Sequence, residues 1–222
     1  MIRLMRFLFL SGFARALRRV TGLAPRRGDL QRRIARLPRH HAMPGGDRQA
    51  DFNLLMVQSL QVAVSHLEDQ GILRNDAVAM AKEAFLANGS GVTRAAFGLW
   101  LAGTRDPVAQ MQKQPCLTDL TREMWGQGVE AHEVTGPDRV TLHVTRCPFA
   151  DYLWNVAEPD LMPVFCAYDA QWMEQVNASR RPVTVNRSGT IATGAERCDF
   201  TFVRAEKAQA EEDSGCWGRI NG

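Results

Sequence analysis

Residues 139–147 read RVTLHVTRC, a stretch in which polar and apolar side chains alternate with a period of two. This alternation predicts a β-strand, because successive side chains of a strand point to opposite faces of the sheet. The apolar face should carry Val140, Leu142 and Val144. Pro148 cannot donate a hydrogen bond to a neighbouring strand, so the strand should end there. Cys147 is therefore expected at the rim of the sheet, on the face that also carries His143.

The segments on either side of this strand differ in their apolar spacing. Two further strands are predicted, at 181–191 and 197–203. Between the first strand and the second, we expect a short helix at about 149–156 and another helix that starts at Pro159 and Pro163. Before the first strand, the apolar spacing and the capping residues predict helices at 50–71, 75–88, 93–101 and, with an interruption, 106–125. Asn88-Gly89 is expected to end the second of these helices. The order favours an α+β fold, with a helical N-terminal half packed on one face of a small antiparallel sheet formed by the C-terminal half.

The composition is that of a globular protein, because 45% of the 222 residues are hydrophobic and 23% are charged. This length predicts one domain of ordinary size with an appendage. We expect a basic N-terminal arm and linker at 1–49, a single α+β domain at 50–205 and a flexible tail at 206–222.

The net charge of +3 hides a strong asymmetry along the chain. Residues 1–50 hold twelve arginines against two aspartates, so this segment carries +10 and the remainder carries −7. A basic arm on an acidic body can touch anionic lipid or nucleic acid, or fold back on its own domain, and composition does not choose among these.

The apolar run at residues 4–14 is followed by Arg15, Arg18 and Arg19, which fits neither a cleavable signal nor a spanning helix. We interpret residues 1–20 as a basic helix lying on a surface, either a membrane interface or the protein's own body. Peripheral membrane contact through residues 1–20 stays open, and no nucleic-acid partner is expected. Five cysteines form an odd set in a chain of this size, which favours free thiols in a reducing compartment, the cytoplasm.

Three predicted elements each carry a cysteine: Cys147 at a strand end, Cys166 on a helix and Cys198 at the start of the last strand. Asp169 follows Cys166 by three residues, so the two side chains should share a helix face. The sequence around them reads RCPF at 146–149, VFCAYD at 164–169, TIATG at 190–194 and CDF at 198–200. In this order the four strings resemble the L-2-amino-thiazoline-4-carboxylic acid hydrolase family. The resemblance covers about a third of the chain and has no counterpart for the segment before Ala50.

The resemblance implies a hydrolase-like domain that opens the five-membered ring of 2-amino-thiazoline-4-carboxylate and gives a carbamoylated cysteine. Water or an enzyme nucleophile must add to the electron-poor C2 of the ring, and a proton must reach the departing heteroatom. Cys166 with Asp169 is the first candidate for this pair, and Cys147 is the second thiol. Arg187 or Arg146 is expected to hold the substrate carboxylate by parallel hydrogen bonds. Cys198 and His143 are expected to line the same pocket, and no cofactor is expected.

Other interpretations of these residues remain open. Free cysteines are often simply buried, and Cys198 shares its strand face with two phenylalanines, which suggests core packing. Asp169 should raise the pKa of a neighbouring thiol unless it is protonated or a cation intervenes. Three cysteines with Asp169 or His143 would also suit zinc, although no paired C-x-x-C spacing is present. A non-catalytic sensor or carrier, docked through its basic arm, is the alternative function.

Overall fold

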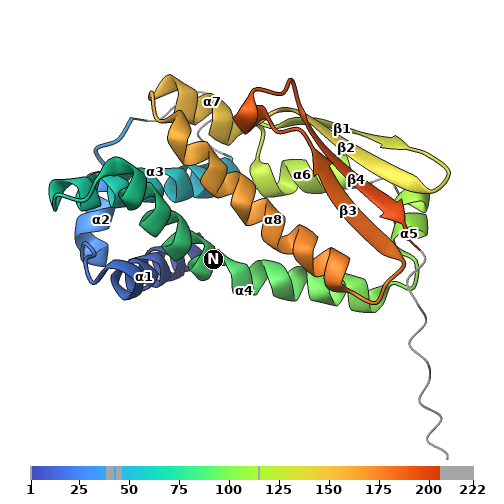
Figure 1. Cartoon of the computed structure of the whole chain (residues 1–222), viewed down its shortest axis with the longest axis horizontal. Helices are drawn as coiled ribbons and strands as arrows, with labels where there is room; N and C mark the ends of the chain where they lie inside the picture. Colours follow the sequence, from blue (N-terminus) through green and yellow to red (C-terminus); the bar gives the residue numbers. More distant parts are fainter. Residues whose placement is uncertain (1, 39–42, 44–46, 115, 206–222) are drawn as a thin grey trace, which may run out of the picture.

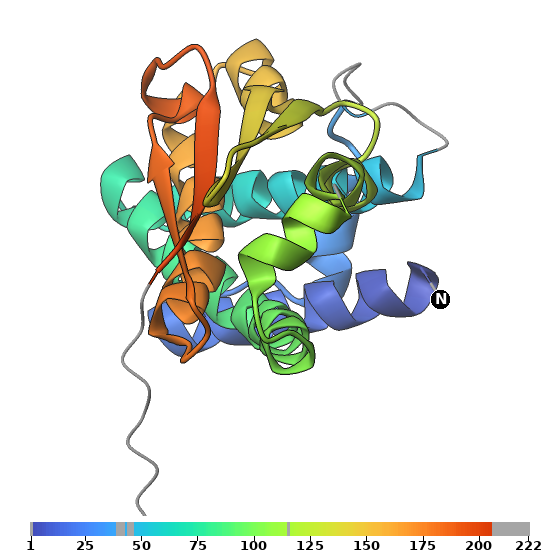
Figure 2. The same cartoon turned by 90° about the vertical axis from the view of Figure 1, so that its right-hand side faces the viewer.

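The structure is a computed structural model that describes residues 2–38, 43, 47–114 and 116–205. Helices form one layer, and a four-stranded antiparallel sheet lies against them at the C-terminal end of the fold (Figures 1 and 2). The predicted α+β class is therefore confirmed. The predicted tail, 206–222, lies outside the described residues.

The sheet comprises β1 (Glu130–Thr135), β2 (Arg139–Arg146), β3 (Val183–Ser188) and β4 (Cys198–Arg204) in the order β1-β2-β4-β3. Each pair is antiparallel. The predicted apolar face of β2 is buried as expected, and it faces the apolar side chains of β4 through the pairs Val140–Phe202, Leu142–Phe200 and Val144–Cys198. Pro148 begins the next helix, so the strand ends where the sequence predicts.

The helical layer that covers this sheet is built from segments on both sides of it in sequence. Its elements are α3 (Arg48–Asp69), α4 (Arg74–Gly103), α5 (Pro107–Lys113), α6 (Leu117–Trp125), α7 (Pro148–Asn155), α8 (Met162–Ala178) and the short 3₁₀ helices η1 (Pro159–Leu161) and η2 (Ile191–Thr193). Helix α8 lies along the sheet in Figure 1, and α4 packs on its other side. The side chain of Asp47 accepts hydrogen bonds from the first free backbone N–H groups of α3, and Asp106 does the same for α5.

The predicted break at Asn88-Gly89 is wrong, because α4 runs without interruption from Arg74 to Gly103. Gly89 lies beneath the ring of Tyr168, where an added Cβ would collide with the ring. The hydroxyl of Tyr168 donates to the carbonyl of Gly89 at 3.3 Å, and the amide of Asn88 donates to the carbonyl of Phe9 at 3.2 Å. Asn88 and Gly89 therefore make close contacts with neighbouring helices, and this packing outweighs the tendency of an Asn-Gly pair to end a helix.

The described part of residues 1–49 packs against the other helices. Helix α1 (Ile2–Thr21) contacts α4, and α2 (Arg27–Ile34) contacts α3. The hydrophobic core includes six of their side chains: Leu10, Phe13, Ala16, Leu17, Leu30 and Ile34. Composition left open whether the arm contacts lipid or nucleic acid or folds back on its own domain. The described part of the arm folds back on the domain. The boundary at residue 49 stays a prediction about which part folds by itself.

Truncation of Phe13 tests whether α1 belongs to the core. This side chain is fully buried and lies edge-on to the ring of Phe85, with ring centroids 6.1 Å apart. Phe13→Ala should lower the free energy of unfolding by about 3–5 kcal/mol, because it leaves a cavity in a packed core. Urea unfolding followed by circular dichroism measures this loss. Leu8→Ala on the same helix is the control and should change stability little, since Leu8 is 58% exposed. Equal midpoints for the two variants would show that α1 does not stabilise the fold.

Candidate active site

Four elements meet at one end of the sheet: the N-terminus of α7, the first turns of α8, the strand β3 and the start of β4 (Figure 1). Aromatic stacking fixes this junction. The ring of Phe165 on α8 stacks on Phe149 of α7 at 4.3 Å between centroids. Further along α8, Trp172 stacks on Phe202 of β4 at 5.9 Å. These contacts hold the face of α8 that carries Cys166 and Asp169 against the sheet.

Asp169 and Arg187 form the charged pair at this junction. The guanidinium Nη1 of Arg187 lies 3.6 Å from Oδ2 of Asp169, and the two side chains are 16% and 17% exposed. The same nitrogen donates to the backbone carbonyl of Cys166 at 3.2 Å. The guanidinium also lies over the ring of Phe200, 5.7 Å from its centroid. Trp172 donates its indole N–H to Asp169 at 3.4 Å.

Burial dominates the protonation of Asp169. Removal from water raises the pKa of its carboxyl to about 6, although the Arg187 charge and the hydrogen bond from Trp172 both lower the pKa. A carboxyl group with a pKa near 6 exchanges its proton close to neutral pH, which suits a general acid or base.

The thiols of Cys147, Cys166 and Cys198 are protonated, and therefore neutral, at pH 7. Burial raises the pKa of Cys147 to about 12 against two opposing backbone N–H groups of α7, and burial raises the pKa of Cys166 to about 11 against the charge of Arg187. Burial also raises the pKa of Cys198, whose sulfur accepts the backbone N–H of Ile191 at 3.3 Å. Burial, rather than the charge of Asp169 on which the sequence-based objection rested, is the main cause of these raised pKa values, and at Cys166 the opposing charge of Arg187 has more effect than Asp169. Attack by any of these sulfurs requires a base.

These groups lie near enough to one another for their charges to influence each other's pKa values. The charge of Asp169 raises the pKa of Cys147, of Cys166 and of Cys198, and Arg187 lowers the pKa of the latter two. We call these five residues the thiol–carboxyl cluster. It combines side chains from α7, α8, β3 and β4 that are up to 51 positions apart in sequence, from 147 to 198.

Two of the predicted site residues lie apart from this cluster. Arg146 is 40% exposed, and it forms ion pairs with Asp151 at 2.6 Å and with Glu130 at 3.4 Å. His143 lies on the face of the sheet opposite Cys198, where its Nδ1 is 2.5 Å from Oδ1 of Asp199. Their predicted roles in substrate binding receive no support from these contacts. Arg187, the other predicted cation, lies in the cluster.

The sequence reasoning missed two members of the immediate surroundings. Trp172 follows Asp169 by three residues, so the same helix periodicity that linked Cys166 to Asp169 could have found it. Phe200, the platform under Arg187, depends on the strand register between β3 and β4, where Arg187 faces Phe200. That register was not accessible from residue spacing. Among the described residues, no three His, Cys, Asp or Glu side chains gather as a metal site would require.

The fold and the cluster define an α+β protein with a half-buried group of thiols, one proton-exchanging carboxyl and one guanidinium, a set suited to adding a nucleophile to a small polar substrate. The family model for L-2-amino-thiazoline-4-carboxylic acid hydrolase matches residues 53–202, and the chain belongs to this family. The resemblance in the four sequence strings is thereby confirmed. The match contains the whole thiol–carboxyl cluster and begins after α1 and α2.

Comparison with curated proteins finds no match. Among solved structures, the ferrous unliganded H-NOX protein from K. algicida aligns with a TM-score of 0.35 and 11% identity, over 92% of this chain and 98% of that chain. A point mutant of the same H-NOX protein aligns with a TM-score of 0.34 and 11% identity, over 90% of this chain and 97% of that one. Nothing about the present chain is inferred from likeness at this level.

The raised pKa of Asp169 should appear in the pH dependence of stability. Because the pKa in the folded protein, about 6, lies above the ordinary value of 3.8, the folded protein binds this proton more tightly than the unfolded chain does. This contribution is complete below pH 3.8 and is lost as the pH rises through about 6. Relative to the wild type, Asp169→Asn should therefore gain up to about 3 kcal/mol of unfolding free energy between acid and neutral pH.

Urea unfolding of both proteins from pH 4 to pH 8 gives this difference. The effect of the Arg187 charge is already contained in the Asp169 pKa of about 6. Any remaining cost of the substitution does not depend on pH, so only the change with pH counts. Asp119→Asn is a matched control at a side chain that is 78% exposed, and it should show no such change. A pH-independent difference for Asp169→Asn would mean that its carboxyl has an ordinary pKa.

Proposed function

We propose that this protein is a ring-opening hydrolase of small cyclic amidine-like substrates such as 2-amino-thiazoline-4-carboxylate, with a carbamoylated cysteine as product. Membership of the family makes hydrolysis the reaction class. The observation that carries the proposal is the cluster itself, in which Cys147, Cys166 and Cys198 share one environment with Asp169 and Arg187. Four free cysteines among the described residues suit the reducing cytoplasm, which is the compartment we propose.

In the proposed reaction, the Cys166 thiol transfers its proton to Asp169 as its sulfur bonds to C2 of the ring. The electron pair of the C2–N double bond moves to the ring nitrogen, which takes up a proton from solvent. The exocyclic nitrogen then forms a double bond to C2 and releases a proton to solvent as the C2–S bond of the ring breaks, and Asp169 protonates the departing sulfur. Water next adds to the C2 that is bound to Cys166, and the carbon–oxygen double bond forms as the Cys166 sulfur leaves with a proton. Overall, one water is consumed and the enzyme is regenerated.

Arg187 is suited to bind the substrate carboxylate because contacts within the thiol–carboxyl cluster hold its guanidinium in place. Its Nη1 already contacts Asp169 and the Cys166 carbonyl, and the Phe200 ring lies beneath it. A substrate carboxylate beside the guanidinium would compete with Asp169 for the positive charge of Arg187. The pKa of Asp169 should then rise further on binding, so the carboxyl would hold the proton it must later donate.

Replacement of the thiols tests the nucleophile. Cys166→Ala should lower kcat for ring opening of 2-amino-thiazoline-4-carboxylate by about 1,000-fold or more, because the covalent intermediate of the proposed reaction forms on the Cys166 sulfur. Cys116→Ala is the control, since this exposed cysteine lies outside the cluster. Product formation is followed by chromatography at saturating substrate. If Cys147→Ala loses turnover and Cys166→Ala keeps it, Cys147 is the nucleophile. Wild-type protein that binds the ring without opening it would instead support the sensor or carrier.

The pH profile of kcat/KM tests the role of Asp169 as base. Because burial raises the pKa of Asp169 to about 6, the ionised form that accepts the thiol proton should be lost below that pH. The rate should therefore fall about tenfold per pH unit below pH 6. Asp169→Asn should remove this acid limb together with most of the activity, while Asp119→Asn should keep both. An acid limb that persists in Asp169→Asn would assign the base to another group.

A further inference from the structure

The outer face of α1 is not the polar face that a solvent-exposed helix normally shows. Leu4 is 60% exposed, Phe7 46% and Leu8 58%, and all three lie within the first two turns of the helix. The opposite face is the one that carries the buried Phe13 and Leu17. The apolar residues of the outer face are thus additional to those that hold α1 in the core.

The outer face of α1 continues into arginine side chains. With about 100° per residue, Leu4, Leu8 and Arg15 project in nearly the same direction, and Phe7 and Arg18 lie close beside them. Arg15 and Arg18 are exposed, as is Arg19. Apolar side chains therefore occupy the N-terminal half of one exposed stripe, and cationic side chains occupy its C-terminal half. No acidic residue occurs in α1.

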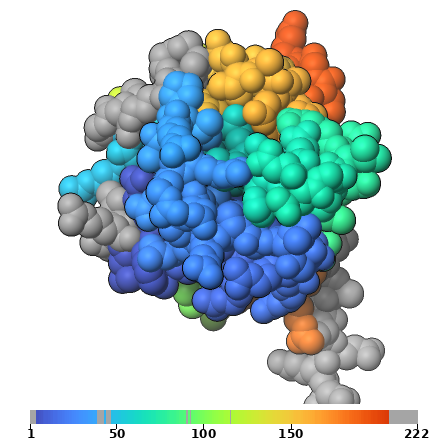
Figure 3. All heavy atoms as spheres, turned by 90° about the vertical axis from the view of Figure 1, so that its left-hand side faces the viewer, coloured from blue at the N-terminus to red at the C-terminus, as the bar shows by residue number. Residues whose placement is uncertain are grey.

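Helix α2 extends this surface sideways. The guanidinium of Arg27 lies over the exposed ring of Phe7, 4.4 Å from its centroid, so the two helices present a joined apolar and cationic surface. Between them is a hollow of about 310 Å³. Its lining includes four arginines and no acid: Ser11, Ala14, Arg15, Arg18, Pro25, Arg26 and Arg27. Figure 3 shows the two helices in dark and middle blue, side by side on one face of the molecule.

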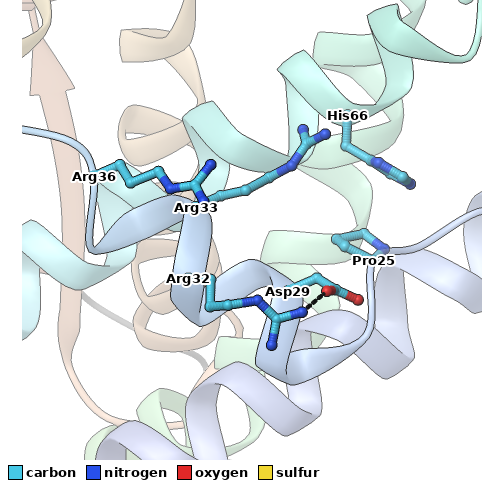
Figure 4. Close-up of a pocket in the computed structure, with 6 residues that line it drawn as sticks. All are labelled: Pro25, Asp29, Arg32, Arg33, Arg36 and His66. Atoms are coloured by element: carbon cyan, nitrogen blue, oxygen red, sulfur yellow. Dashed lines mark hydrogen bonds and ion pairs between the residues drawn. The ribbon is translucent and has the colours of Figure 1, made fainter.

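A second hollow of about 290 Å³ adjoins the first at Pro25. Its charged lining comes mainly from α2, as Figure 4 shows: Asp29, Arg32, Arg33, Arg36 and His66. Arg32 pairs with Asp29 one turn away on α2, and Arg33 pairs with Asp69 at 2.9 Å. The cationic surface therefore continues along α2 beyond the apolar stripe of α1.

We propose that the surface formed by α1 and α2 docks on a bilayer that contains anionic phospholipid. The side chains of Leu4, Phe7 and Leu8 would enter the interfacial layer, and the arginines around Pro25 would lie against headgroup phosphates. Charge complementarity favours an anionic partner, because residues 1–50 carry +10. The exposed aliphatic side chains favour lipid over nucleic acid, since phosphate contacts to nucleic acid use no aliphatic stripe.

The structure fits a protein that lies on a membrane. Among the described residues, no helix has both the length and the apolar character needed to cross a bilayer. Apolar side chains limited to Leu4, Phe7 and Leu8 together with several arginines give reversible binding whose strength depends on lipid charge and on salt. The thiol–carboxyl cluster lies at the junction of α7, α8 and the sheet, so a membrane bound to α1 and α2 would leave it uncovered (Figure 1).

Co-sedimentation of the full chain with vesicles tests this surface. Vesicles of phosphatidylcholine with about 30% phosphatidylglycerol should bind the protein at low salt, and vesicles of pure phosphatidylcholine should not. The charge variant Arg15→Gln/Arg18→Gln/Arg26→Gln should weaken binding about 100-fold, because each arginine near the surface contributes roughly a fivefold factor. The apolar variant Leu4→Ser/Phe7→Ser/Leu8→Ser should also release the protein.

Matched control variants place the same substitutions elsewhere on the surface. Leu73→Ser/Leu99→Ser replaces side chains that are 74% and 75% exposed, and Arg105→Gln/Arg122→Gln/Arg180→Gln removes three exposed arginines. Both controls should bind vesicles like the wild type. Equal losses in controls and test variants would overturn the proposal in favour of unspecific charge attraction. Binding of inorganic phosphate or of a DNA duplex without binding to anionic vesicles would likewise overturn it and assign the surface to those ligands.

Discussion

The ion pair between Asp169 and Arg187 is the constraint on which the candidate site depends. It joins α8 to β3 in a place where each side chain is less than one-fifth exposed. An unpaired carboxylate there would be strongly unfavourable, and so would an unpaired guanidinium. The two charged groups are 3.6 Å apart, Arg187 also donates a hydrogen bond to the Cys166 carbonyl, and the Trp172 indole donates one to Asp169. The position of α8 on the sheet is therefore coupled to the protonation of one carboxyl.

The sequence predicted those parts of the structure that arise from local periodicity. The alternation in residues 139–147 placed Val140, Leu142 and Val144 on the buried face, because a strand has only two faces and one must be apolar. The spacing of three between Cys166 and Asp169 placed both on one helix. The strand patterns placed Cys147 and Cys198 at element ends, where antiparallel pairing brings them to the same end of the sheet. The resemblance to one family rested on the residues of the four strings and on their order.

What the sequence could not predict depends on contacts between distant segments. Asn88-Gly89 reads as a helix end, but Tyr168 packs on Gly89 from α8, and no local pattern announces that contact. Arg146 and Arg187 looked equivalent as carboxylate ligands until the structure placed Asp151 beside Arg146 and Asp169 beside Arg187. His143 illustrates the two faces of a strand, since it contacts its cross-strand partner Asp199 on the face opposite Cys198.

Helix α4 connects the two surfaces to which we assign functions. Its Asn88-Gly89 step touches α1 through the Phe9 carbonyl and α8 through Tyr168, so one turn of this helix contacts both. The ring of Phe85 reinforces the same link, because it packs edge-on against Phe13 of α1 and against Phe165 of α8. Phe165 in turn stacks on Phe149, beside the thiol–carboxyl cluster. A close-packed path of aromatic side chains thus runs from the N-terminal helix to the site. The packing of α1 and the packing of the first turns of α8 therefore share one ring, that of Phe85, in a close-packed interior.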